Sequence, residues 1–252
     1  MTLVLITALG VGAATVVGAL IGFAFKNMSH RFSDLILSFA AGVMLAAAVM
    51  GLIIPSVEYG MDHGKGIALL MTVVGIFVGA ICLTLVDRLV PHLHRLAGSD
   101  IEAHENKELS RVLLFVMAIA IHNLPEGIAA GVGFGSGNDA QALIIAGGIA
   151  LQNIPEGMVI IAPLLVAGVS VMRTVCIALS IGLLEVVGVW MGFALGTVSA
   201  AMLPVMLGFA GGAMLYVTSD EMIPETHAHG YQKQATYALL LGFMTLLLLE
   251  RI

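Results

Sequence analysis

Eight long apolar runs divide this chain, and they restrict its fold more than any other feature of the sequence. A helix needs roughly 20 apolar residues to cross a bilayer, and hydrocarbon admits only helices or closed barrels, because every backbone polar group must be paired internally. These runs are too long and too uniform for barrel strands. They lie near residues 2–25, 33–54, 66–90, 112–134, 141–167, 174–197, 201–219 and 233–250. We therefore predict an all-α integral membrane protein with eight transmembrane helices in one polytopic domain, residues 1–252.

Composition agrees with this fold class and excludes others. Of the 252 residues, 60% are hydrophobic and 10% are charged, whereas soluble domains carry about 25% charged residues. A net charge of −6, with only ten lysine and arginine residues, argues against a nucleic-acid partner. The first run lacks a basic segment before it and is too long for a signal-peptide core, so we predict a span there. Cys82 and Cys176 lie in apolar runs, which predicts no structural disulfide.

The basic residues predict the orientation of the spans. Cytoplasmic loops of membrane proteins carry an excess of lysine and arginine. With eight spans, eight of the ten basic residues lie on one side, and only Lys65 and Arg251 lie on the other. Both termini are therefore predicted to be extracytoplasmic, and the longest loop, residues 91–110, cytoplasmic. That loop is typical of a solvated connector; the alternative is a weak metal-collecting loop made of His92, His94, Glu102, His104, Glu105 and Glu108.

Two similar hexapeptides interrupt the fourth and fifth runs. They read His-Asn-Leu-Pro-Glu-Gly at 122–127 and Gln-Asn-Ile-Pro-Glu-Gly at 152–157. A carboxylate at the bilayer centre costs roughly 2.5–3.5 kcal/mol on the insertion scale, and a proline removes a helical hydrogen bond. Because the chain incurs both costs twice in the same order, we predict a binding site for a cation in the membrane interior.

The spacing of three acids locates this site. Glu126 and Glu156 are 30 residues apart, and Glu185 follows 29 residues later in the sixth run. Half a span, a short loop and half a span back take about that many residues, so the three carboxylates are predicted at similar depth on helices 4, 5 and 6. Like charges at close range cannot all ionise in a low dielectric without a neutralising partner. A divalent ion, or two ions bridged by shared carboxylates, resolves the conflict.

The types of side chain narrow the choice of ion. On the fourth span His122 and Asn123 lie within about a 100° arc of Glu126, and Gln152 and Asn153 repeat the arrangement beside Glu156. One imidazole among oxygen donors, with no thiolate, suits zinc, iron(II), manganese, cobalt or cadmium better than copper(I). Magnesium and calcium prefer sets made only of oxygen.

Acidic segments follow the second and seventh runs and form two candidate mouths of an ion path. Acidic mouths concentrate cations, although ordinary polarity at helix ends explains these residues almost as well. No inverted repeat is evident outside the hexapeptides. The outer mouth would contain Glu58, Asp62 and His63, and the inner mouth Asp220, Glu221, Glu225, His227 and His229.

These features together resemble the ZIP (Zrt-, Irt-like protein) family of divalent-metal transporters, in particular its bacterial GufA-like branch. The similarity covers nearly the whole chain: the eight-span layout, the cytoplasmic loop between spans 3 and 4, the paired hexapeptides, and residues 220–225 after 208–216. The fifth-span motif begins with Gln152 where many family members have histidine, as fits the GufA-like branch. The resemblance implies a two-metal centre with Glu126 and Glu156 as bridges. It would comprise Met44, His122, Asn123, Glu126, Gln152, Asn153, Glu156 and Glu185.

The resemblance also implies a function and a mechanism. It implies movement of divalent metal into the cytoplasm across the inner membrane, with zinc preferred and cadmium, iron(II), cobalt or manganese as further substrates. Spans 1, 4, 5 and 6 would carry the site and slide against a scaffold of spans 2, 3, 7 and 8. The metal would be cargo rather than a cofactor, and a homodimer is left open.

Three classes of function remain open at this stage. A secondary carrier and a channel-like facilitator would use the same site. An intramembrane metal-dependent hydrolase is the third class. His122 and Glu126 have the i, i+4 spacing of metalloprotease helices, but the second histidine of His-Glu-x-x-His is missing. No nucleophile–base pair or phosphate-binding arginine is evident at midplane depth. The sequence therefore favours a transporter and predicts no catalytic residue.

Overall fold

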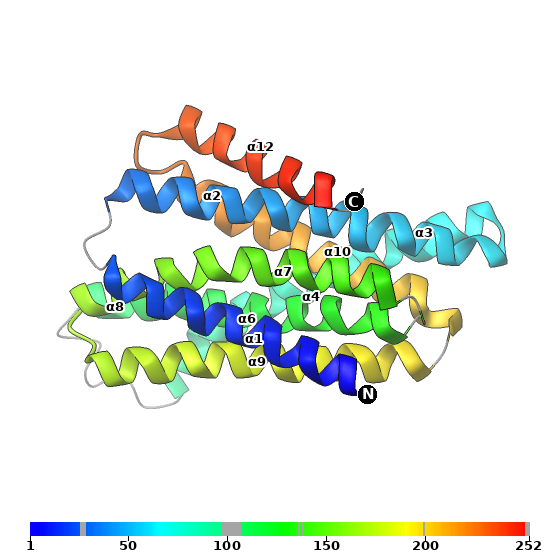
Figure 1. Cartoon of the computed structure of the whole chain (residues 1–252), viewed down its shortest axis with the longest axis horizontal. Helices are drawn as coiled ribbons and strands as arrows, with labels where there is room; N and C mark the ends of the chain where they lie inside the picture. The colour runs from blue at the N-terminus through cyan, green and yellow to red at the C-terminus, as the bar shows by residue number, and fades with distance from the viewer. Residues whose placement is uncertain (26–28, 97–106, 136, 138, 199, 250–252) are drawn as a thin grey trace.

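Every regular element in the described part of this computed structural model is helical (Figure 1). The structure describes residues 1–25, 29–96, 107–135, 137, 139–198 and 200–249. Within those residues, five helices are long and apolar enough to cross a membrane. They are Thr2–Ala24, His30–Gly60, Lys65–Val86, Ala142–Val166 and Val171–Thr197. The protein is thus all-α, with several helices suited to a bilayer.

In the first part of the chain, α1 (Thr2–Ala24) is followed by a long rod built from three consecutive segments. Ser29 caps the start of this rod, since its hydroxyl accepts a hydrogen bond from the Phe32 N–H at 3.3 Å. A short 3₁₀ turn, η2, then leads to α4. The bounds are α2 (His30–Ala46), the π-helix η1 (Ala47–Ile53), α3 (Ile54–Gly60), η2 (Met61–His63) and α4 (Lys65–Leu96).

The second part of the chain begins with α6 and α7, which carry the two hexapeptides with their prolines inside the helices. After α9 a second rod follows the plan of the first, with a π-helix between two α-helical segments. The bounds are α6 (Lys107–Gly135), α7 (Asp139–Val159), α8 (Ile161–Val166), α9 (Val171–Val198), η3 (Ala200–Met202), α10 (Leu203–Val217), η4 (Thr218–Met222), α11 (Ile223–Thr226) and α12 (Gln232–Leu249).

Each predicted run coincides with a helical rod, but several rods are longer than the runs. The second rod continues to Gly60 rather than ending near 54, and the seventh continues to Thr226 rather than 219. α4 reaches Leu96 and α6 begins at Lys107, so helix replaces both ends of the predicted loop 91–110. Hydropathy shows only where the apolar side chains end. The helix can continue beyond that point, because its backbone hydrogen bonds do not depend on apolar side chains. Residues 97–106, including Glu102, His104 and Glu105, lie outside the described residues.

The rods pack as two groups. In the first, α6 packs along α9, and α1 packs against both α7 and α9. In the second, α10 packs along α4 and α12 along α2. Figure 1 shows α12 and α2 side by side at the top and α1 with α9 at the bottom. Contacts of α2 with α7 and of α10 with α6 join the two groups. This division matches the groups of spans 1, 4, 5, 6 and 2, 3, 7, 8 implied by the family resemblance.

An internal repeat relates the two ends of the chain. Phe-Ala-Ala-Gly-Val-Met-Leu at 39–45 in α2 recurs 170 residues later as Phe-Ala-Gly-Gly-Ala-Met-Leu at 209–215 in α10. α2 and α10 run in opposite directions (Figure 1). Each rod then changes to a π-helix whose last hydrogen bond spans five residues, from Ile54 N–H to Val49 O and from Ile223 N–H to Thr218 O. A proline follows each of these isoleucines.

Glycine contacts repeat with the same offset of 170 residues. Gly12 of α1 and Gly182 of α9 lie back to back, because a Cβ on either would collide with the carbonyl oxygen of the other. Gly42 of α2 packs on the backbone of α12, and its counterpart Gly212 of α10 packs on the backbone of α4. A repeat therefore extends beyond the hexapeptides, although none was evident there in the sequence analysis. The repeat is hard to see in the sequence because unlike apolar side chains fill many of the equivalent positions.

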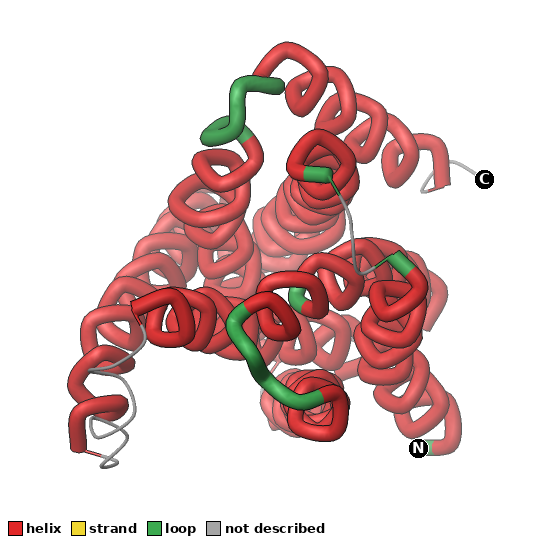
Figure 2. The backbone as a smooth tube through the Cα atoms, turned by 90° about the vertical axis from the view of Figure 1, so that its left-hand side faces the viewer, coloured by secondary structure: helices red, strands yellow, loops and turns green. Residues whose placement is uncertain are grey.

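Viewed along the helix axes, the rods form a compact bundle with the loops at its ends (Figure 2). Side chains buried in the bundle are mainly alanine and branched aliphatics, among them Ala40, Ala47, Ala129, Ala210 and Ala213. Small residues at helix interfaces allow the close backbone contact on which packing in lipid depends. The large exposed apolar side chains are spread over the outer faces, as on α4, where Phe77 is 63% exposed.

Candidate metal centre

The predicted site residues lie inside the bundle and come from four rods. Asn123 and Glu126 are on α6, Gln152, Asn153 and Glu156 are on α7, Glu185 is on α9 and Met44 is on α2. The three glutamates are at most 1% exposed, and the two asparagines, Gln152 and Met44 are fully buried. Three carboxylates are thus enclosed within an apolar bundle, where an isolated charge carries a large desolvation cost.

Asn123 connects the acids of two other helices. Its Nδ2 donates a hydrogen bond of 3.0 Å to Glu185 Oε1 and a longer one of 3.4 Å to Glu156 Oε1. One amide group of α6 therefore reaches carboxylates on both α7 and α9. Side chains of the fourth, fifth and sixth predicted spans therefore meet in the packed structure, and their common depth in the membrane stays a prediction.

Gln152 donates a hydrogen bond to the third acid, Glu126. Its Nε2 donates a hydrogen bond of 2.7 Å to Glu126 Oε1, which links α7 back to α6. The hydrogen bonds of both amides therefore cross from one hexapeptide helix to another helix. Within the described residues, no three histidine, cysteine, aspartate or glutamate side chains gather around one point as a ready metal cluster. Amide N–H groups lie between the carboxylates.

Several polar atoms of the centre are buried without a hydrogen-bond partner among the described residues. They are Asn123 Oδ1, Gln152 Oε1, both amide atoms of Asn153, and Glu185 Oε2. A buried polar atom left unpaired costs about 1–3 kcal/mol, and native structures contain few of them. Most of these atoms are oxygens, which are suitable ligands for a divalent cation. A bound cation would satisfy these oxygens together.

One polar contact of the centre was missed by the sequence analysis. Thr15 of α1 donates a hydrogen bond of 2.6 Å from its Oγ1 to Glu185 Oε1, and both residues are fully buried. No local motif marks Thr15. The signal that could have found it is the internal repeat, because Thr15 precedes Glu185 by 170 residues.

The contacts of two predicted ligands, His122 and Met44, with the other site residues are not established. The backbone of His122 belongs to α6, but its side chain lies outside the described part of the structure. Met44 is fully buried on α2, which packs against α7. Its contact with the carboxylates stays a prediction.

The residues of the predicted outer mouth lie at the end of the second rod. Glu58 of α3 and Asp62 of η2 are exposed, and the side chain of His63 is outside the described residues. At the opposite end of the bundle, Asp220 and Glu225 are exposed, whereas Glu221 is half-buried.

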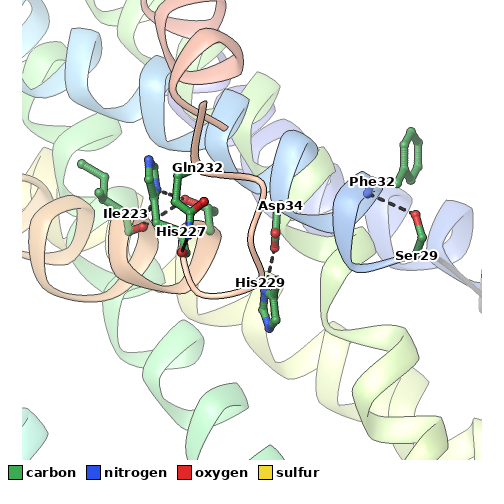
Figure 3. A network of polar contacts seen from close by, with 8 residues as sticks. Ser29, Phe32, Asp34, Ile223, His227, His229 and Gln232 are labelled. Carbon is green, nitrogen blue, oxygen red and sulfur yellow. Dashed lines mark hydrogen bonds and ion pairs between the residues drawn. The ribbon is translucent and has the colours of Figure 1, made fainter. Parts of the chain in front are cut away.

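Hydrogen bonds hold both histidines of the predicted inner mouth to the protein (Figure 3). His227 Nδ1 lies 2.8 Å from the carbonyl oxygen of Ile223, and His229 Nδ1 lies 3.0 Å from Asp34 Oδ1. The ring of His229 also stacks on that of His30, with 4.6 Å between centroids. Asp34 is buried at the start of α2 and was not among the predicted residues. This contact fastens the turn between α11 and α12 to α2.

Comparison with known proteins agrees with this architecture. The family model described as "ZIP Zinc transporter" matches residues 94–250, more than half of the chain. The chain belongs to the ZIP family. As a ZIP protein with several apolar helices of membrane-spanning length, it is a multi-pass membrane protein.

Individual relatives extend the match to nearly the full length. The chain is 38% identical over 248 residues to zinc transporter GufA of Myxococcus xanthus, covering 98% of this chain and 97% of that protein. It is 38% identical over 240 residues to zinc transporter ZIPB of Bordetella bronchiseptica, covering 94% and 77% respectively. Zinc transporter ZupT of Chlorobium chlorochromatii is 32% identical over 250 residues, covering 93% and 91%. These ZIP relatives confirm the resemblance to a bacterial branch of the family.

Proposed function

We propose that this protein carries divalent transition-metal ions, zinc preferentially, through the cytoplasmic membrane into the cell. The observation that carries the proposal is the burial of three carboxylates, Glu126, Glu156 and Glu185, each hydrogen-bonded to an amide of a neighbouring helix, beside amide oxygens that have no described partner. A divalent cation would neutralise the acids and satisfy the unpaired oxygens. The relatives named as zinc transporters favour the same cargo.

The ligand set would hold two ions that share Glu126 and Glu156. His122, Gln152 and Met44 would complete the first position, and Asn123, Asn153 and Glu185 the second. The set has one imidazole and no thiolate, so binding would be moderate enough for release, and zinc, cadmium, iron(II), cobalt and manganese are all chemically acceptable. The metal would be a substrate in transit, and no catalytic role is assigned to any residue.

The packing supports alternating access as the mechanism. Every proposed ligand except Met44 belongs to α6, α7 or α9, which pack with α1 as one group. Met44 belongs to the second group, on α2. Movement of the first group along the second would carry the ligands across the membrane and separate them from Met44. We place eight helices across the bilayer with both termini outside, as the basic residues predict.

Uptake by purified protein in liposomes tests the proposal. A carrier saturates with metal concentration, and we expect Glu156→Ala and Glu126→Ala to abolish saturable zinc uptake, because each removes a shared ligand. The matched control is Asp139→Ala, which removes an exposed carboxylate from the start of α7 and should leave uptake unchanged. Wild-type uptake by either folded glutamate variant would refute the proposed site. Uptake that rises linearly without saturation would instead support a channel-like facilitator.

A further inference from the structure

We infer that Thr15 is a positioning residue of the metal centre, which holds Glu185 so that one carboxylate oxygen faces the ion. This inference rests on the proposed function, because it assigns Thr15 a role in metal affinity rather than in folding alone. Thr15 is on α1, a helix that contributes none of the predicted ligands.

The direction of the Thr15 hydroxyl separates it from other threonines in this structure. A helical threonine commonly donates to the carbonyl oxygen three or four residues earlier in the chain. Thr84, Thr174 and Thr218 do so, with Oγ1–O distances of 2.9, 3.1 and 2.8 Å to Ala80, Ser170 and Met214. Thr15 instead donates across the interface to Glu185 at 2.6 Å. A short hydrogen bond to a carboxylate is stronger than a neutral one.

The two hydrogen bonds to Glu185 fix which oxygen remains for a cation. Thr15 Oγ1 and Asn123 Nδ2 both donate to Oε1, from α1 and α6 respectively. Oε2 is buried and has no hydrogen-bond partner among the described residues. The carboxylate is therefore held at one oxygen while the other remains available as a ligand. Removing the Thr15 hydroxyl would take away the shorter of these two hydrogen bonds to Oε1.

The inverted repeat explains why Thr15 is in this place. Residues of α1 and α9 correspond with an offset of 170, and Gly12 and Gly182 meet back to back where the two helices cross. The same offset relates Thr15 to Glu185. Where α9 supplies a carboxylate, α1 supplies a neutral hydroxyl from the equivalent position. The centre thus gains a hydrogen-bond donor for Glu185 instead of a fourth acid beside it.

Three substitutions test the inference, with zinc itself as the probe. Thr15→Val keeps the side-chain shape and removes the donor, whereas Thr15→Ser keeps the donor. Thr174→Val removes a buried hydroxyl whose described hydrogen bond is local, to the carbonyl oxygen of Ser170 just before α9. Loss of a group that orients a metal ligand typically costs 10–100-fold in affinity. We expect Thr15→Val to weaken zinc binding by the purified protein about tenfold and to raise the KM of uptake. Thr15→Ser and Thr174→Val should stay within about threefold of wild type.

The outcomes separate this inference from the proposed function. Zinc affinity unchanged in Thr15→Val, or lowered equally in Thr15→Val and Thr15→Ser, would overturn the positioning role while leaving the site intact. Failure of the wild-type protein to bind zinc would overturn the proposed function itself. If Thr15→Val does not fold, Thr15→Ala removes the hydroxyl without filling its space, and its zinc affinity decides the question against Thr15→Ser in the same way.

Discussion

Gly188 lies where α9 packs on α6, three residues after Glu185, and its replacement by alanine would disturb the metal centre through the backbone. A Cβ at this position would lie 2.6 Å from the carbonyl oxygen of Leu124, 2.9 Å from the Cα of Gly127 and 3.0 Å from the backbone nitrogen of Ile128. All three atoms belong to the backbone of α6. No side-chain rotation can relieve these contacts, so the helices themselves must separate.

The required separation can be estimated from these distances. Ordinary contact begins at 3.4 Å, so α9 must move away from Leu124 by about 0.8 Å. The hydrogen bond between Asn123 Nδ2 and Glu185 Oε1 measures 3.0 Å. A movement of that size along the bond would stretch it to about 3.8 Å, beyond the range of a hydrogen bond. Gly188→Ala should therefore weaken the centre as well as the helix packing.

Overpacking a well-filled interface costs about 1–3 kcal/mol, and 1 kcal/mol lowers the melting temperature of a 150–250-residue protein by roughly 2–4 °C. We expect Gly188→Ala to lower the melting temperature of the detergent-solubilised protein by roughly 2–12 °C by these figures. Zinc affinity measured on the same samples should fall too. The matched control is Gly147→Ala on α7, where a Cβ would meet no atom within 4 Å.

Alanine at position 147 should leave the melting temperature unchanged or slightly raise it, since alanine is favoured over glycine inside a helix by up to about 1 kcal/mol. Zinc binding should remain at the wild-type level. If Gly188→Ala matches Gly147→Ala in both measurements, the close approach of α6 and α9 does not limit the geometry of the centre, and the reasoning fails.

Two further variants test other parts of the structure. Gln152→His places an imidazole where an amide now donates to Glu126 at 2.7 Å, and it should shift uptake toward nitrogen-preferring zinc and away from manganese; an unchanged zinc-to-manganese ratio would contradict the assignment of Gln152 as a ligand. His229→Ala removes the hydrogen-bond partner of the buried Asp34 carboxylate and should destabilise the protein by about 1–3 kcal/mol, which thermal unfolding in detergent measures. Adding Asp34→Asn should recover part of the loss, and a His229→Ala protein as stable as wild type would show that this contact is unimportant.

Some features of the centre could be predicted from the sequence because they depend on local chemistry. Long apolar runs have few solutions in lipid, so every predicted run coincides with a helical rod. Hydrocarbon also makes an acid in such a run conspicuous, and this identified Glu126, Glu156 and Glu185. Their near-equal spacing of 30 and 29 residues predicts that they lie at similar depth. The hexapeptides supplied Asn123 and Gln152 on the same faces.

Other features were settled only by packing. The sequence did not indicate that the Asn123 amide bridges Glu156 and Glu185, or that the Thr15 hydroxyl meets the same carboxylate from 170 residues away. It also gave no sign that Asp34 binds His229. A hydrogen bond between helices depends on which faces meet and how closely their backbones approach. In this protein glycines such as Gly12 and Gly182 set that approach, and their partners are distant in the chain. Burial cost is a property of each residue and can be read locally, whereas the partner that offsets it exists only once the helices have packed.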